Sequence, residues 1–323
     1  MENEMVKDSK KILFIGSGRI VSELDTPTSE HILTHAHAWY VDQIHDLYFF
    51  DLEPAHSLKA AQKWDGKSFT EDEIPFHTWD VITVATPDDT HLAWCQKIKD
   101  LSYKVIVLEK PPTTSLSDWY QLNELFKLKK ASICVHYIRR FPPLFQSIFQ
   151  DLQNQKWGQL LSIQAYYGNG FIHNACHIID LITWWFGPFT EFKLHSPIYD
   201  RPNDPSFSVI AQNHLTNNIL INPISSQYYT LFEIDIILSE GRIRLTNGGL
   251  NIEFYEVKES PVFKGFQTLQ LQNCINSELN QSLKFLQKSI LEHINHQIPL
   301  PATLDSIHDG FQTVLTALEK KDL

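Results

Sequence analysis

A short loop that contains two glycines is the first segment of this sequence whose residue types point to chemistry. It runs Gly16-Ser17-Gly18-Arg19-Ile20 and directly follows an apolar run, Lys11–Gly16, that is typical of a buried strand. Glycines at this position let the backbone approach a pyrophosphate, whose charge is favoured near the start of the following helix. We therefore take Gly16, Gly18, Arg19 and Ile20 as candidate cofactor-binding residues. The motif is incomplete, because Val21 stands where a third glycine or alanine is usual, and a tight turn without a ligand is the alternative interpretation.

An acid at the end of the next apolar run, Asp46–Asp51, strengthens this interpretation. Asp51 is placed to accept hydrogen bonds from the ribose hydroxyls of NAD, and its charge would repel the 2′-phosphate of NADP. It lies farther from the glycines than the usual spacing of about 20 residues, which indicates an insertion between them. A surface acid that opens a turn is the alternative. Loop and acid together favour a dinucleotide site with NAD(H) as the cofactor.

The elements that must position these residues alternate in type over the first part of the chain. Short, almost continuously apolar runs are separated by helical segments, which is typical of a parallel sheet covered on both faces. We therefore expect an N-terminal Rossmann domain, an α/β doubly wound parallel sheet, over residues 1–137. The expected strands are 11–16, 46–51, 80–85, 104–108 and 131–137, and the expected helices are 29–44 (capped by Thr28 or Ser29), 54–64, 90–98 and 116–130.

The pattern changes in residues 138–323. We expect helices at 145–155 and 174–186, a strand at 160–167, and then alternating polar and apolar residues from 189 to about 271. Glu240-Gly241 and Gly248-Gly249 are hairpin signals within that stretch. The prediction is a C-terminal α+β domain with a large, mostly antiparallel, open-faced sheet. Two amphipathic helices at 281–294 and 304–320 close the chain, and we allow for these last helices to pack back on the first domain.

Composition excludes several classes of protein. The formal net charge of -11 argues against a nucleic-acid partner, and the Lys127–Lys130 run is typical of a solvated helix face. No stretch approaches the 18 or so apolar residues of a membrane helix, and Met1–Lys11 does not resemble a signal peptide. The four cysteines are scattered without CxxC spacing, which predicts neither disulfides nor a zinc cluster and suits a cytoplasmic location.

Two segments after later strands resemble motifs of a known family. Ala85-Thr86-Pro87-Asp88-Asp89-Thr90-His91 and Leu108-Glu109-Lys110-Pro111-Pro112 are similar to the ATPxxxH and EKP motifs of the glucose-fructose oxidoreductase / inositol dehydrogenase (Gfo/Idh/MocA) oxidoreductase family. Arg139-Arg140-Phe141 and the segment 170–181 agree with the same family, so the resemblance spans nearly the whole chain. The stretch Thr34-His35-Ala36-His37-Ala38 resembles a subgroup associated with surface-polysaccharide sugars.

The resemblance implies roles for individual residues. Lys110 matches the EKP lysine, which contacts both the nicotinamide side and the reacting hydroxyl, and His177 matches the general acid/base. Removing hydride from a secondary alcohol requires a group to take the hydroxyl proton; an imidazole can do so near neutral pH, and an ammonium can stabilise the alkoxide. The implied cofactor-binding residues of these motifs are Ala85, Thr86, Pro87, His91, Glu109 and Lys110. A surface lysine at a strand end is the alternative for Lys110.

One position departs from the family pattern. Most members carry Asp four residues before the catalytic histidine, and this chain carries His173 there. His173 and His177, with Asp180 nearby, suggest a metal site as one alternative. Because the HExxH glutamate is absent and the family needs no metal, we expect none. We instead count His173 as a catalytic candidate that hydrogen-bonds the substrate or His177, with a polar helix-entry residue as the plain alternative.

The predicted function is an NAD(H)-dependent oxidoreductase that transfers hydride to or from a hydroxyl-bearing carbon of a sugar, polyol or nucleotide sugar. As in the family, a homodimer or homotetramer through the C-terminal sheet is expected. Two rivals stay open. One is a non-catalytic, NAD-dependent sensor or partner-binding protein on the same fold, which His173 favours and the intact Lys110 and His177 oppose. The other is an enzyme that uses NAD transiently for sugar elimination or hydrolysis.

Overall fold

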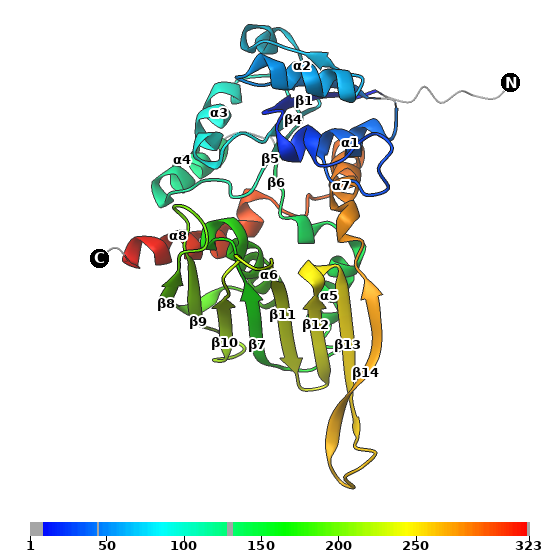
Figure 1. Ribbon diagram of the computed structural model, residues 1–323, viewed down its shortest axis with the longest axis vertical. Helices are drawn as coiled ribbons and strands as arrows, with labels where there is room; N and C mark the ends of the chain where they lie inside the picture. Colours follow the sequence, from blue (N-terminus) through cyan, green and yellow to red (C-terminus); the bar gives the residue numbers. More distant parts are fainter. Residues whose placement is uncertain (1–8, 44, 128–131, 322–323) are drawn as a thin grey trace, which may run out of the picture. The chain divides into compact units, whose positions relative to one another are not determined.

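The computed structural model describes residues 9–43, 45–127 and 132–321. The chain forms two compact units, each shown in Figure 1. The first contains the chain up to Phe141 together with Asn280–Leu304, and the second contains Pro142–Leu279 and the chain from Asp305 onward. Residues 1–8 of the polar N-terminal segment, residues 128–130 of the lysine run and Ala131 of an expected strand lie outside the described residues.

A six-stranded parallel sheet forms the centre of the first unit, in the order β3-β2-β1-β4-β5-β6. The apolar runs form these strands because residues such as Ile12–Ile15 are wholly buried. The expected doubly wound parallel sheet is confirmed. Its strands are β1 (Lys11–Ile15), β2 (Asp46–Phe50), β3 (Lys67–Ser68), β4 (Val81–Val84), β5 (Val105–Leu108) and β6 (Ser132–Val135).

Five α-helices belong to the described part of the first unit. The last of these helices lies in Asn280–Leu304, the later part of the chain that belongs to this unit. Its buried stripe consists of Leu283, Leu286 and Ile290. Lys284 on the same helix donates a hydrogen bond to Asp42 Oδ1, just beyond the first helix, over 2.7 Å. The helices are α1 (His35–Tyr40), α2 (Pro54–Lys63), α3 (His91–Ile98), α4 (Leu116–Lys127) and α7 (Ser282–His296).

The first helix is much shorter than expected, and the prediction of a helix over 29–44 was wrong. The N-cap is Thr34, whose Oγ1 accepts the backbone N–H of His37 over 3.2 Å, rather than Thr28 or Ser29. A π-helical turn, Arg19–Glu23, follows the glycine loop. The first helix of the parallel domain is thus divided into a turn and a six-residue helix.

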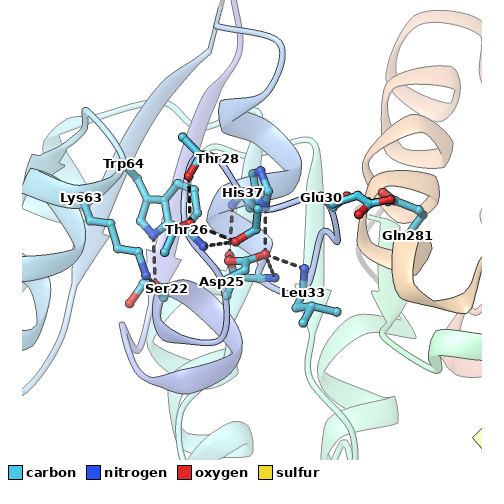
Figure 2. Close-up of polar contacts among 12 residues, drawn as sticks. Ser22, Asp25, Thr26, Thr28, Glu30, Leu33, His37, Lys63, Trp64 and Gln281 are labelled. Carbon is cyan, nitrogen blue, oxygen red and sulfur yellow. Dashed lines mark hydrogen bonds and ion pairs between the residues drawn. The ribbon is translucent and has the colours of Figure 1, made fainter.

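Asp25 explains why the intervening segment is a loop. Its carboxylate accepts the backbone N–H groups of Leu33 and Thr34 over 2.6 and 3.1 Å and the Thr34 hydroxyl over 2.6 Å. His37 Nδ1 lies 2.9 Å from Asp25 Oδ2, and Figure 2 shows this buried carboxylate surrounded by its partners. Backbone donors that an uninterrupted helix would use internally are bound by a side chain here.

The second unit holds an eight-stranded sheet in the order β14-β13-β12-β11-β7-β10-β9-β8. All pairs are antiparallel except β7 with β10, so the expected mostly antiparallel sheet is confirmed. Every second residue of a strand such as β11 is buried, as on a sheet with one covered face. The strands are β7 (Leu160–Tyr167), β8 (Phe189–Ile198), β9 (Ser206–Asn213), β10 (Ile219–Pro223), β11 (Phe232–Leu238), β12 (Gly241–Thr246), β13 (Asn251–Glu259) and β14 (Gln267–Asn276).

Three helices pack with the buried face of this sheet: α5 (Pro143–Gln153), α6 (Cys176–Phe186) and α8 (Leu304–Lys321). Gly310 allows α8 to lie close to α6, because a Cβ there would be 2.5 Å from Thr183 Oγ1. The helix expected from residue 174 begins as α6 at Cys176, after a π-helical turn, Phe171–Ala175. None of the described helices is long and apolar enough to cross a membrane.

Candidate functional site

The loop after β1 is held against the loop after β4 at the carboxyl edge of the parallel sheet. Gly16 has φ of 88°, and a Cβ on it would lie 2.6 Å from the carbonyl oxygen of Ala85, so both its conformation and its neighbour require glycine. Gly18 differs, because no atom lies within 4 Å of the place where its Cβ would be. The backbone there is open to a ligand's close approach, which fits the pyrophosphate of a dinucleotide.

The π-helical turn places Arg19 and Ile20 directly after this opening. The Arg19 side chain is exposed and Ile20 is half-buried. Lys63 and the indole N–H of Trp64 donate to the carbonyl oxygen of Ser22 over 2.6 and 3.1 Å, which fixes the end of the turn, as Figure 2 shows. Arg19 therefore adds an exposed positive charge next to the opening at Gly18, and such a charge suits a phosphate.

Asp51 follows β2 and is bonded to the glycine loop. Its Oδ2 accepts the backbone N–H of Ser17 over 2.7 Å, its Oδ1 accepts that of Glu53 over 3.0 Å, and His56 Nδ1 lies 3.6 Å from Oδ1. The side chain is 17% exposed. An ionised carboxylate accepts about four hydrogen bonds, so capacity remains for ribose hydroxyls.

His91 joins the two motifs that follow β4 and β5. The ring is fully buried, with Nδ1 2.9 Å from the carbonyl oxygen of Pro111 and Nε2 3.0 Å from that of Thr86. Because carbonyl oxygens only accept, both contacts are hydrogen bonds when the ring carries both protons. Ala85 and Thr86 are half-buried and Pro87 is exposed beside them. His91 therefore fixes the position of both loops and presents no polar atom to solvent.

Glu109, at the end of β5, forms a buried triad with two histidines. Its Oε1 lies 2.6 Å from His35 Nε2 at the start of α1 and 2.7 Å from His136 Nδ1 just after β6. Burial acts to raise the pKa of Glu109, but the charges and hydrogen bonds of His136 and His35 outweigh it and hold that pKa well below its ordinary value. Burial lowers the pKa of His35. The triad is thus an anion between imidazole donors.

Lys110 is half-buried and follows Glu109 at the same edge of the sheet. Its backbone N–H donates to the other carboxylate oxygen, Glu109 Oε2, over 3.3 Å, and the peptide bond to Pro111 is cis. The structure therefore brings the predicted residues of the first unit to one edge of one sheet, in the loops that follow β1, β2, β4 and β5.

His173 and His177 belong to the second unit. His173 is half-buried within the π-helical turn, and His177 is buried in the first turn of α6. Asp204, in the loop between β8 and β9, anchors this segment: Oδ1 accepts the backbone N–H groups of Phe171 and Ile172, and Oδ2 accepts that of His173, each over 2.9 Å. A carboxylate here is also favoured by the positive end of the helix dipole.

Sequence reasoning missed three residues of these arrangements. Asp204 carries no local signal, because it caps a turn 31 residues earlier in the chain. His136 was a usable signal, as a polar residue directly after an apolar strand that neighbours the EKP segment. His35 was visible only through the resemblance to the surface-polysaccharide subgroup.

Comparisons with known proteins agree with this geometry. Residues 10–137 match the model of a family described as an oxidoreductase family with an NAD-binding Rossmann fold. YteT of Bacillus subtilis (strain 168), an oxidoreductase by name, is 25% identical over 134 residues, which cover 35% of this chain and 31% of that protein. The match therefore spans about a third of its curated relative.

Solved structures match over almost the whole chain. UDP-N-acetylglucosamine 3-dehydrogenase GnnA from Acidithiobacillus ferrooxidans gives a TM-score of 0.71 at 14% identity, covering 97% of this chain and 96% of that one. A super-repressor mutant of Gal80p from Saccharomyces cerevisiae gives a TM-score of 0.77 at 13% identity, covering 98% of this chain and 96% of that one. At such identities the likeness shows the fold alone.

Fold and sheet-edge site together define a Rossmann domain of the NAD-binding type. Residues 10–137 match the Gfo/Idh/MocA oxidoreductase family, and the match is to its NAD-binding Rossmann domain. The expected resemblance is confirmed.

Proposed function

We propose that this protein is an NAD(H)-dependent dehydrogenase or reductase that moves hydride to or from a hydroxyl-bearing carbon of a sugar, polyol or nucleotide sugar. The observation that supports it best is the shared sheet edge, where the glycine loop, Asp51, the Thr86 loop and Lys110 follow neighbouring parallel strands. Ligands of open α/β sheets bind at that edge. The sugar-nucleotide name of one structural neighbour supports the substrate class.

The cofactor would be held by backbone and side chains of the first unit. The open approach at Gly18 and the Arg19 cation suit the pyrophosphate, and Asp51 suits the ribose hydroxyls. When bound, the nicotinamide supplies the hydride acceptor or donor. We assign the Lys110 ammonium to stabilising the substrate oxygen as charge develops on it. We assign His177 to taking or returning the hydroxyl proton, with His173 as its hydrogen-bonding neighbour.

The test combines binding with turnover. NADH and NADPH are titrated by fluorescence, and absorbance at the NADH band is followed while myo-inositol, glucose and UDP-N-acetylglucosamine are offered with NAD. Tight NADH binding with a growing NADH band supports the proposal. Tight binding without turnover of a wider sugar panel favours the sensor, and product formed without net NADH favours transient use of NAD. Binding of neither cofactor would overturn all three.

We further propose a homodimer or homotetramer through the open face of the second-unit sheet, and a cytoplasmic location. Leu161 on β7 and Ile210 on β9 are 49% and 48% exposed on strands whose alternate residues are buried. Apolar side chains of this kind suit contact with a second copy. Light scattering of the wild type and of Leu161→Glu tests this, and a monomeric wild type would contradict it. All four cysteines are free thiols, which supports a reducing compartment.

A further inference from the structure

We propose that His35 and His136 are positioning residues for Lys110: both donate a hydrogen bond to one oxygen of Glu109 and so fix the backbone from which Lys110 projects. The role of Lys110 itself rests on the proposed function. The positioning does not, because it is a property of the folded first unit.

The triad joins three elements that are distant in sequence. His35 begins α1, Glu109 ends β5 and His136 follows β6, and their side chains converge inside the unit with 2% and 1% of the two histidines exposed. The register of the neighbouring strands supports this convergence, since the backbone N–H of His136 donates to Leu108 over 2.9 Å and that of Glu109 donates to Val84 over 2.9 Å. The Glu109 carboxylate is therefore bound by side chains from two other elements, and the Glu109 backbone is bound by the neighbouring strand.

Hydrogen-bond chemistry fixes the direction of each bond. An ionised carboxylate only accepts, so His35 donates from Nε2 and His136 donates from Nδ1. With Nδ1 protonated, the remaining nitrogen of a neutral His136 is an acceptor; that atom, Nε2, is buried and has no hydrogen-bond partner among the described residues. Two imidazole N–H donors thus hold one buried anion.

The anion in turn holds the segment that carries Lys110. Glu109 Oε1 is occupied by the two imidazoles, which leaves Oε2 for the backbone N–H of Lys110. On the far side of Lys110, the carbonyl oxygen of Pro111 is bound by His91. Lys110 therefore projects from backbone that is anchored immediately before and after it. Loss of the Oε1 donors would free the carboxylate to turn and release the first of these anchors.

The same three side chains are the kind that bind transition metals, but their spacing is that of hydrogen bonds. Their ligand atoms all lie within 4.8 Å of one another, and the two N–O distances are 2.6 and 2.7 Å. Around a tetrahedral zinc, ligand atoms about 2.0–2.2 Å from the ion would be roughly 3.3 Å apart. Protons between nitrogen and oxygen account for the observed distances without displacement of any side chain.

The test removes each donor and then restores it. His35→Leu and His136→Leu abolish the donors, whereas His35→Gln places an amide N–H near the Nε2 position and His136→Asn places one near the Nδ1 position. On a substrate from the sugar panel, the leucine variants should lower kcat on the order of 10- to 100-fold, as a slightly misplaced catalytic group does. KM and NADH affinity should change little, and the amide variants should recover most of the lost rate.

His37→Leu is the matched control. His37 lies on the same helix, is equally buried and also bonds a carboxylate, that of Asp25, but its contact belongs to the loop before α1. The His37→Leu variant should lose about as much thermal stability as the His35→Leu and His136→Leu variants, while its kcat should stay unchanged. If a leucine variant does not fold, Glu109→Gln is used in its place, because glutamine keeps the shape of the Glu109 side chain and removes its negative charge.

A readout without substrate separates this inference from the proposed function. Lysines are reductively methylated with ¹³C-formaldehyde, and the Lys110 resonance is identified by its loss in Lys110→Arg. Removal of either donor should shift or broaden that resonance, whereas His37→Leu should not, even if no sugar is ever turned over. An unchanged Lys110 resonance together with unchanged kcat overturns the proposal. The proposal is also overturned if the wild-type protein binds one zinc per chain and His136→Leu does not.

Discussion

Ser17 donates its backbone N–H to Oδ2 of Asp51 over 2.7 Å, although 34 residues separate the two. The bond ties the glycine loop to the acid at the end of β2, so the groups proposed for the pyrophosphate and the ribose are fixed relative to each other. Preorganisation of this kind reduces the ordering cost of binding.

Cofactor preference should follow from this carboxylate. NADH should bind more tightly than NADPH, because the 2′-phosphate would lie against the Asp51 anion. Asp51→Asn should lower the ratio of the two affinities by about tenfold, which corresponds to about 1.4 kcal/mol. Fluorescence titration measures both constants, with Glu53→Gln as a control at an exposed acid nearby. Equal or tighter NADPH binding by the wild type would refute the role of Asp51.

Lys110 should matter for turnover far more than for binding. Lys110→Ala should lower kcat on the order of 10²–10⁴-fold while NADH affinity stays within a few-fold, since charge on the substrate oxygen develops mainly in the transition state. Lys104→Ala is the control, because Lys104 is an exposed lysine next to the same strand that pairs with Asp80. Near wild-type kcat in the Lys110 variant would remove this residue from the mechanism.

His173 should set the pH range of the reaction. His173→Asp places a carboxylate one turn from His177, which favours the protonated imidazole and raises its pKa. A base must be deprotonated to accept a proton, so the rising limb of the pH–rate profile should move to higher pH while activity survives. The profile of kcat/KM for the wild type, His173→Asp and His173→Ala tests this. If all three coincide, His173 is a structural residue at the helix entry.

Acid should destabilise the protein through the Glu109 triad. Burial lowers the pKa of His35 below its ordinary 6.5, so the unfolded chain binds the extra proton first and stability falls as pH drops below about 6.5. Glu109, whose pKa is also lowered in the folded state, adds to this loss below its ordinary 4.5. Thermal unfolding from pH 7.5 to 5 should show a shallower loss of Tm in His35→Gln than in the wild type. Parallel curves would contradict a lowered pKa of His35 in the folded protein.

The parallel sheet could be predicted because its strands are apolar on both faces and end at Gly16, Asp51 and Ala85, where the chemistry-bearing loops begin. The first helix could not be located, since the deciding group, Asp25, binds donors eight and nine residues away. Helix periodicity carries no information about such a side chain. Individual strands between 189 and 231 were equally hidden, because they are half-exposed and their order in the sheet depends on partners distant in sequence.

The site was predictable to the extent that its residues follow strands. Gly16, Asp51 and Lys110 are each within a residue or two of a strand end, and the sheet brings such ends together whatever the loops contain. His35 and Asp204 reach their partners from a helix start and from a loop. Their contacts are set by packing, which a single sequence does not display.

Asp204 holds the turn around His173 by accepting hydrogen bonds from three backbone N–H groups. These three anchors of the segment therefore come from a loop that is distant in sequence. A substitution at position 173 keeps these donors in place, because every residue except proline carries a backbone N–H. Variants that change the side chain at position 173 can therefore test its role in proton transfer while the backbone anchor from Asp204 is kept.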